Sequence, residues 1–156
     1  MHSKKHAGFS LIELLIVVTI IGIVASIAVP NLLASRRAAN EGSAQQSMRT
    51  ISSCEATYQY TYGNGSFADM ITLGARTLTD SVLATGQKSG YIFVATPVAG
   101  PPATYWAYAI PITTSGIGQT GTRRFGIAED AVLRGDTTLS APADSAEVKA
   151  MNPVGN

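Results

Sequence analysis

Gly8-Phe9-Ser10-Leu11-Ile12-Glu13 is the stretch that decides the fold, because it opens an apolar run that continues to Val29 and is followed by Pro30. From Phe9 to Val29 the run has 21 residues and one ionisable side chain, Glu13. An α-helix of that length is about 31 Å long, close to the hydrocarbon thickness of a bilayer. The sequence therefore predicts a membrane-spanning helix that begins beside a carboxylate.

The carboxylate of Glu13 has two interpretations. An ionised side chain within a spanning segment is costly and usually has a partner. Glu13 lies one turn from the start of the run, so it can also reach the headgroups and stabilise the positive end of the helix dipole. Its position alone leaves both interpretations open.

The hexapeptide resembles a family signature when its surroundings are included, with Lys4 and Lys5 before it and the unbroken apolar run after it. It is similar to the class III leader and amino-terminal helix of type IV pilins and type II secretion pseudopilins. In that family a membrane peptidase cuts after the glycine and methylates the new amino terminus. The resemblance implies that residues 1–8 are a cleaved leader, that the cut separates Gly8 from Phe9, and that Phe9 is methylated.

The same resemblance implies a structural role for other positions in the run. Gly22 and Pro30 fall where pilins tend to carry a helix-weakening glycine and a kinking proline, so we expect the helix between them to lose hydrogen bonds when subunits pack. Glu13 becomes the fifth residue after the cut. We expect its carboxylate to meet the amino group of Phe9 on a neighbouring subunit and to guide assembly.

The function that the resemblance implies is that of a filament subunit in a type IV pilus or a secretion pseudopilus. Its partners are then other copies of itself, minor pilins or pseudopilins, the prepilin peptidase, an inner-membrane platform protein and an assembly ATPase. We expect one pass through a bacterial inner membrane with a periplasmic head, followed by transfer into the filament. The sequence leaves open which filament this is, and whether the subunit is major or minor.

Two alternatives place the same segment in other classes of protein. The first is a membrane-tethered periplasmic binding domain that does not polymerise. The second is a secreted enzyme released by signal peptidase near Val29, but the apolar run is longer than the usual 7 to 15 residues of a signal and contains a carboxylate.

Composition removes most catalytic chemistry. The chain has 156 residues and a net charge of +1, which predicts no nucleic-acid partner. Both histidines, His2 and His6, lie in the expected leader, and Cys54 is the only cysteine, so no internal disulfide or catalytic triad can form. We expect no enzyme activity, no cofactor and no metal, although Glu129, Asp130 and Asp136 could supply oxygen ligands for calcium.

Residues 31–62 read as the continuation of the same helix. Ala44, Met48, Ile51, Glu55, Tyr58 and Tyr62 recur at helical spacing and predict a stripe that packs on the head. We expect one kinked helix from Phe9 to Tyr62, about 81 Å long by its rise per residue, ended by Gly63-Asn64-Gly65. The first half, residues 9–30, is the transmembrane and polymerisation segment, and the second half is an amphipathic spine.

The fold class expected from this order is α+β, a long helix against a small antiparallel sheet, as in pilins. A globular head over residues 63–134 has predicted strands at 91–96, 104–112, 123–128 and 132–134, with a short helix capped by Thr79 or Asp80 before them. Residues 135–156 hold little apolar material and predict a loose tail.

Two motifs in the head carry weaker functional hints. Gly116 to Gly121 matches G-x-G-x-x-G, but a strand and not a helix follows, so we interpret it as a hairpin loop and not a nucleotide site. Arg123 and Arg124 beside Glu129 and Asp130 could form a binding rim, but a solvated strand edge explains them better.

Overall fold

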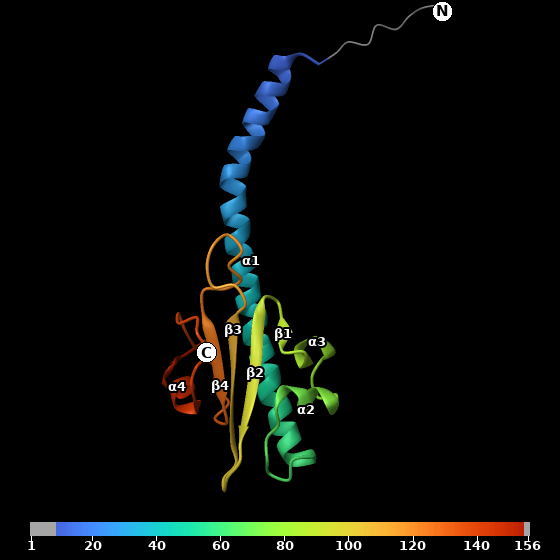
Figure 1. The fold of residues 1–156 in the computed structure, drawn as a ribbon, viewed down its shortest axis with the longest axis vertical. Helices are drawn as coiled ribbons and strands as arrows, with labels where there is room; N and C mark the ends of the chain where they lie inside the picture. The colour runs from blue at the N-terminus through green and yellow to red at the C-terminus, as the bar shows by residue number, and fades with distance from the viewer. Residues whose placement is uncertain (1–8, 155–156) are drawn as a thin grey trace, which may run out of the picture. The chain divides into compact units, whose positions relative to one another are not determined.

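A computed structural model describes residues 9–154 of the chain, and the expected leader with Gly8 lies outside them. Its first element is the helix α1, Leu11–Thr61, which contains Pro30 (Figure 1). The boundaries agree with the predicted helix to within two residues. The chain divides into two compact units, one up to Ser35 and one from Arg36 onward, and each is described by itself.

The second unit is an α+β head, which confirms the predicted fold class. After the spine part of α1, the chain forms short helices and a six-stranded sheet in which neighbouring strands are antiparallel and follow chain order. The helices are α2 (Met70–Ala75), α3 (Ser81–Ala84) and α4 (Ser145–Ala150). The strands are β1 (Gln87–Lys88), β2 (Tyr91–Val98), β3 (Thr104–Pro111), β4 (Arg124–Ala128), β5 (Arg134–Asp136) and β6 (Asn152–Pro153).

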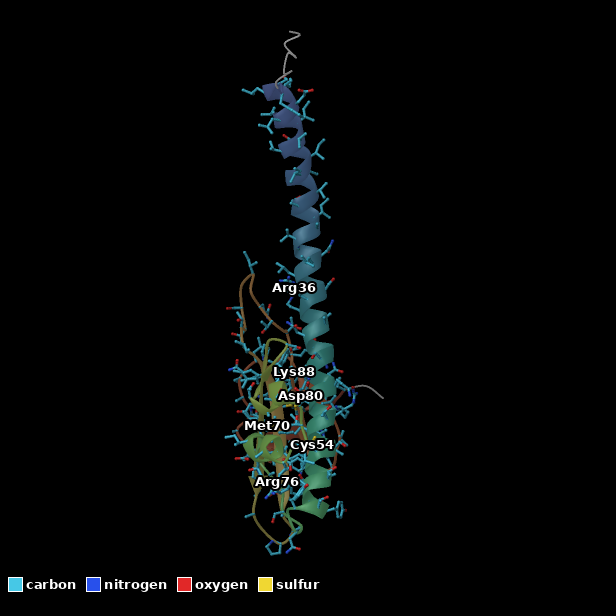
Figure 2. All side chains as sticks on the ribbon, turned by 90° about the vertical axis from the view of Figure 1, so that its right-hand side faces the viewer. Arg36, Cys54, Met70, Arg76, Asp80 and Lys88 are labelled. Carbon is cyan, nitrogen blue, oxygen red and sulfur yellow. The ribbon has the colours of Figure 1, made fainter. Side chains whose placement is uncertain are left out.

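The core of the head forms where the helix stripe meets one face of the sheet. Alternate residues of β2 and β3 are buried, as expected for strands with one face on a core. The predicted stripe is buried at Ala44, Met48, Ile51, Cys54 and Glu55, whereas Tyr62 is exposed, so the packed face ends at Tyr58. Figure 2 shows Cys54 of α1 and Met70 of α2, which both belong to this core.

The strand β2 runs past the point where the sequence predicted its end. Pro97 lies inside β2 and faces Tyr105 of β3, although proline lacks the N–H that a ladder needs. On the other side of β2, the strand β1 pairs only with Tyr91 and Ile92. The missing donor of Pro97 therefore falls on an open edge, where it breaks no pairing.

Two expectations about the carboxyl-terminal part of the head are wrong. The strand predicted at 132–134 lies instead at Arg134–Asp136, because a turn with Ala131 at a φ of 56° and the side chain of Asp130 capping the Val132 N–H extends further than expected. The predicted loose tail is ordered up to Val154 and forms α4 and β6. Val148 and Met151 pack with Ala128 and Trp106 in a small second core.

Candidate functional site

The start of α1 holds the predicted assembly residues. Phe9 is 85% exposed, and the helix begins two residues later at Leu11. The Ser10 N–H donates a hydrogen bond of 2.9 Å to Oε2 of Glu13, three residues further along. This contact is one half of a capping box, in which an acidic side chain at the third helical position satisfies the N–H of the cap residue. The local partner of Glu13 is therefore the backbone N–H of Ser10 in the same chain.

The Ser10-x-x-Glu13 spacing could have been recognised from the sequence as a capping signal. It places a negative charge in the first turn of α1, where the helix dipole favours an anion. The structure thus supports the local interpretation of Glu13 within one chain. Phe9 and Glu13 lie within five residues of one another, which is compatible with a shared role at this helix end.

The apolar part of α1 is exposed on every side of the helix. Its exposed large side chains are Leu11, Ile12, Leu14, Leu15, Ile16, Val17, Val18, Ile20, Ile21, Ile23, Val24, Ile27, Val29 and Leu32. A helix that is apolar all round is normally buried in a membrane or among other helices. Within the described residues, α1 is long and apolar enough to cross a membrane, with an 18-residue window of mean hydropathy 2.8.

The hydroxyl groups within this apolar segment donate hydrogen bonds to backbone carbonyl oxygens of the same helix. Thr19 Oγ1 donates to the Leu15 carbonyl oxygen at 2.8 Å, and Ser26 Oγ donates to the Ile23 carbonyl oxygen at 2.7 Å. Gly22 has no neighbouring atom within 4 Å of the position that a Cβ would occupy. Gly22 and Pro30 both lie inside α1, and the proposed loss of helical hydrogen bonds between them stays a prediction.

The spine carries a buried carboxylate that fastens the loop after α1. Glu55 is 0% exposed, and its Oε2 accepts a hydrogen bond of 3.0 Å from the N–H of Ala68, while Oε1 has no partner in the described part of the chain. Burial raises the pKa of Glu55 to about 7, against the lowering effect of the Ala68 hydrogen bond and with a small raising effect of Asp69. Sequence spacing placed Glu55 on the buried stripe but did not reveal its partner.

Arg124 is buried and is not part of a solvated strand edge, which corrects the sequence interpretation. Its guanidinium makes two bonds to Asp136, at 2.9 and 3.0 Å, and one of 2.6 Å to Glu147. It also donates to the Ser140 carbonyl oxygen. Burial alone lowers the pKa of Arg124, but the two carboxylates outweigh it and raise this pKa above its usual range. Arg124 thus holds residues 136–147 against β4.

The three carboxylates considered for calcium are separated by their own cations. Asp136 is bound to Arg124, Asp130 pairs with Arg134, and Glu129 pairs with Lys149. Across residues 9–154, no group of three potential metal ligands comes together. The described head therefore offers structural ion pairs at these positions.

The G-x-G-x-x-G stretch is a loop between β3 and β4, as predicted, and β4 follows it. Gly121 is required by packing, because a Cβ there would lie 1.9 Å from the hydroxyl oxygen of Tyr91, which is buried and donates a hydrogen bond to the Arg123 carbonyl oxygen. Gly116 adopts a φ of 79°, which favours glycine. The glycines shape a turn and are not followed by the helix that a pyrophosphate site needs.

Comparison with known proteins agrees with this geometry. Residues 3–29 match the family model of the prokaryotic N-terminal methylation motif. The chain is 33% identical over 115 residues to the type IV wide pilus major component PilA4 of Thermus thermophilus, an alignment that covers 69% of this chain and 84% of the relative. No solved structure matches the chain.

Proposed function

Because this chain belongs to the type IV pilin family, we propose that it is a structural subunit of a type IV pilus-like filament, processed by a prepilin peptidase and assembled through its amino-terminal helix. Members of this family are structural subunits and not enzymes. The observation that carries the proposal is the first part of α1, which is apolar and exposed on all sides and begins beside one carboxylate. Such a surface is stable only in lipid or among copies of itself.

Processing creates a positively charged amino terminus on the subunit. Cleavage between Gly8 and Phe9 converts an amide into an amino group, which is then methylated and carries a positive charge at neutral pH. The new end lies two residues before the first turn of α1, close to the carboxylate of Glu13. Cleavage therefore places opposite charges at the start of each helix.

The charge pair supplies a means of aligning subunits. Within one chain, Oε2 of Glu13 accepts from the Ser10 N–H, and among residues 9–154 no second donor bonds to this carboxylate. In an apolar bundle the amino group of Phe9 on a neighbouring subunit is the cation available to Glu13. Opposite charges attract strongly where water is excluded, and an unpaired charge there costs several kcal/mol. A neighbour shifted along the bundle would leave both charges unpaired.

The relative named as a pilus component supports a pilus more than a secretion pseudopilus. In this proposal the apolar segment first holds the subunit in the inner membrane with its head in the periplasm. A platform protein and an assembly ATPase then move it into the filament, which can also contain minor pilins. These machines supply the force, and the helix supplies the adhesion between copies.

The proposal is tested by the mature amino terminus and by substitutions of Glu13. Mass spectrometry of sheared filaments should find a chain that begins at methylated Phe9. A change of Gly8 to a bulky residue should leave an uncut precursor on a gel. Glu13→Leu should stay in the membrane and lower the yield of filaments at least tenfold, which corresponds to about 1.4 kcal/mol or more.

Ser26→Ala is the matched control for Glu13→Leu, because the Ser26 hydroxyl is satisfied by the Ile23 carbonyl oxygen of its own chain. It should assemble as the native chain does. Normal filaments from Glu13→Leu would contradict the charge-pair role. A mature chain that begins near Val29, or one that stays membrane-bound and never polymerises, would contradict the filament proposal as a whole.

A further inference from the structure

The loop between β3 and β4 ends in an exposed apolar side chain. Ile117 is 81% exposed and stands between Gly116 and Gly118, neither of which has a side chain to cover it. Ile112, at the start of the same loop, is also exposed. Single exposed apolar residues are common on proteins, so Ile117 acquires meaning only from the way its loop is held.

The base of this loop is fastened to α1 by side chains of the spine. Asn40 Nδ2 donates to the Thr120 carbonyl oxygen at 2.9 Å, and one carboxylate oxygen of Glu41 accepts from both the N–H and the hydroxyl of Thr122 at 2.7 Å. Arg37 Nη1 donates to Oε1 of Gln119 at 3.3 Å. The tip with Ile117 is therefore carried on an ordered base and is presented in a defined place.

Hydrogen bonds across the loop brace it further. The Thr120 N–H donates to the Thr113 carbonyl oxygen at 3.0 Å, and the Gln119 N–H donates to the Gly116 carbonyl oxygen at 3.2 Å. Much of the entropy of ordering this loop is thus lost on folding of the head and does not oppose a later contact. Ile117 has the properties of a preformed knob.

The opposite end of β3 carries a cavity of matching character. It has a volume of about 240 Å³ and is lined by Ser66, Phe67, Pro97, Val98, Ala99 and Ala103. A cavity of roughly 150 Å³ already holds a benzene-sized group, so this one can hold an isoleucine side chain. The ring of Phe67 packs at a tilt against the ring of Tyr105, with ring centroids 4.7 Å apart. Val98 at the rim is itself exposed.

Figure 1 shows that β3 leads from the turn at 99–103 to the loop at 112–122, so these two connections lie at opposite ends of the strand. The cavity is lined by Ala99 and Ala103 of the turn, and the loop carries Ile117. The eight residues of β3 separate the two by about 27 Å. One subunit therefore cannot fill its own cavity with its own Ile117. A repeated contact between two different surfaces of one protein generates an open polymer instead of a closed dimer.

We infer that Ile117 of one subunit inserts into the cavity at Phe67 and Val98 of the next subunit along the filament. This inference rests on the proposed filament function, which supplies neighbours of the same polarity, so the loop end of one head faces the turn end of another. Two other hollows fit less well. The hollow lined by Arg49, Ser52, Ser53, Ala56, Ile127 and Ala131 includes a cationic side chain, and the one beside α2 and α3 includes the acidic residue Asp69, whereas no lining residue of the cavity at Phe67 is charged.

Disulfide trapping in assembled filaments tests the contact. In full-length chain with Cys54→Ser, the pair Ile117→Cys and Ala99→Cys should give a ladder of dimers, trimers and longer species on a non-reducing gel after mild oxidation. Each single variant should stay monomeric. The pair Ile117→Cys and Ser53→Cys is the matched control, because Ser53 lines the other hollow, the one that includes Arg49, and it should form no ladder.

Filament yield is a second measurement, which tests the contact even where the cysteine variants assemble poorly. Ile117→Asp should lower the yield of sheared filaments about tenfold, whereas Ile117→Leu should stay within twofold of the native yield, and neither should change the folding of the head because the side chain is exposed. Filaments with no ladder, a ladder only with Ser53→Cys, dimers from Ile117→Cys alone, or native yield with Ile117→Asp would each overturn the inference. Absence of filaments from the native chain would instead overturn the proposed function.

Discussion

The two units of this chain solve the burial of apolar surface in different ways. Up to Leu32, the large apolar side chains of α1 are exposed on all sides, and the hydroxyls and the carboxylate bond to nearby backbone. From Arg36 onward, the apolar face of the same helix is covered by a sheet, and polar groups such as Glu55 and Arg124 bond across long stretches of sequence.

One helix therefore packs against two kinds of partner. The head supplies its own core, so its stability depends on residues within the chain. In the first part of α1 the polar side chains bond to their own helix, but the apolar side chains are not buried, so this part needs lipid or other helices. Substitutions in the head should change unfolding, and substitutions in the first part should change insertion and assembly.

Among substitutions in the head, Arg124→Leu is expected to cost the most stability. This change leaves Asp136 and Glu147 without their cation and frees residues 136–147 from β4. Loss of one member of a buried pair costs about 3 to 5 kcal/mol, and because both carboxylates are partly exposed we expect about 2 to 3 kcal/mol here. Trp106, the only tryptophan, packs beside Val148 and Met151, so its fluorescence in urea on detergent-solubilised chain reports the loss.

Lys149→Met is the control for Arg124→Leu, since Lys149 lies on α4, the helix that carries the Arg124 partner Glu147, but pairs with Glu129 at a solvated position. It should change the free energy of unfolding by less than about 1 kcal/mol. If both variants lost the same free energy of unfolding, the exposed ion pair of Lys149 would contribute as much as the buried one of Arg124. Burial of Arg124 would then not explain its effect.

The second effect concerns pH and arises from Glu55. Its pKa is about 7 in the folded chain and 4.5 without burial, so the folded state binds a proton more tightly than the unfolded state. The stabilising effect of this proton is complete below pH 4.5 and is lost as pH rises through 7, a change of roughly 3 kcal/mol. Both histidines precede Phe9, so no imidazole in residues 9–154 titrates in this range.

Glu55→Gln should flatten this pH dependence and stabilise the head at pH 8 by about 1 to 3 kcal/mol, because a neutral amide oxygen can still accept from the Ala68 N–H. Urea unfolding at pH 5 and pH 8 measures the difference. The paired carboxylates Asp80, Asp130 and Asp136 have lowered pKa values, so they change stability only at more acidic pH. A native chain that is equally stable at pH 5 and pH 8 would contradict the role assigned to Glu55.

The sequence predicted those parts of the fold that depend on local pattern. The helical stripe at Ala44, Met48 and Ile51 and the alternation in β2 and β3 are periodic, so the long helix and the antiparallel meander followed from them. The apolar run and the hexapeptide at Gly8 to Glu13 likewise indicated the family, because the methylation motif is contiguous in the sequence and needs no distant contacts to be recognised.

The parts that the sequence did not predict depend on distant contacts. The tail after Gly135 has few apolar residues, but Arg124 fixes it through charges 12 and 23 positions away. The partner of Glu55 is a backbone N–H 13 residues further along, which no spacing indicates. The fastening of the 112–122 loop joins residues about 80 positions apart, between the spine and the sheet.

The smallest effect expected is also the sharpest test of whether the two units are independent. Gly22 and Gly42 both lie inside α1, and a Cβ at either position meets no atom within 4 Å. Alanine should therefore act only through helix propensity, which favours it over glycine by about 0.5 to 1 kcal/mol. Gly42→Ala should raise the free energy of unfolding of the head by that amount, whereas Gly22→Ala should leave it unchanged and lower filament yield if the helix must loosen there. Equal shifts in Trp106-detected unfolding would show that the units are coupled, because the stiffness of the apolar segment would then reach the core of the head.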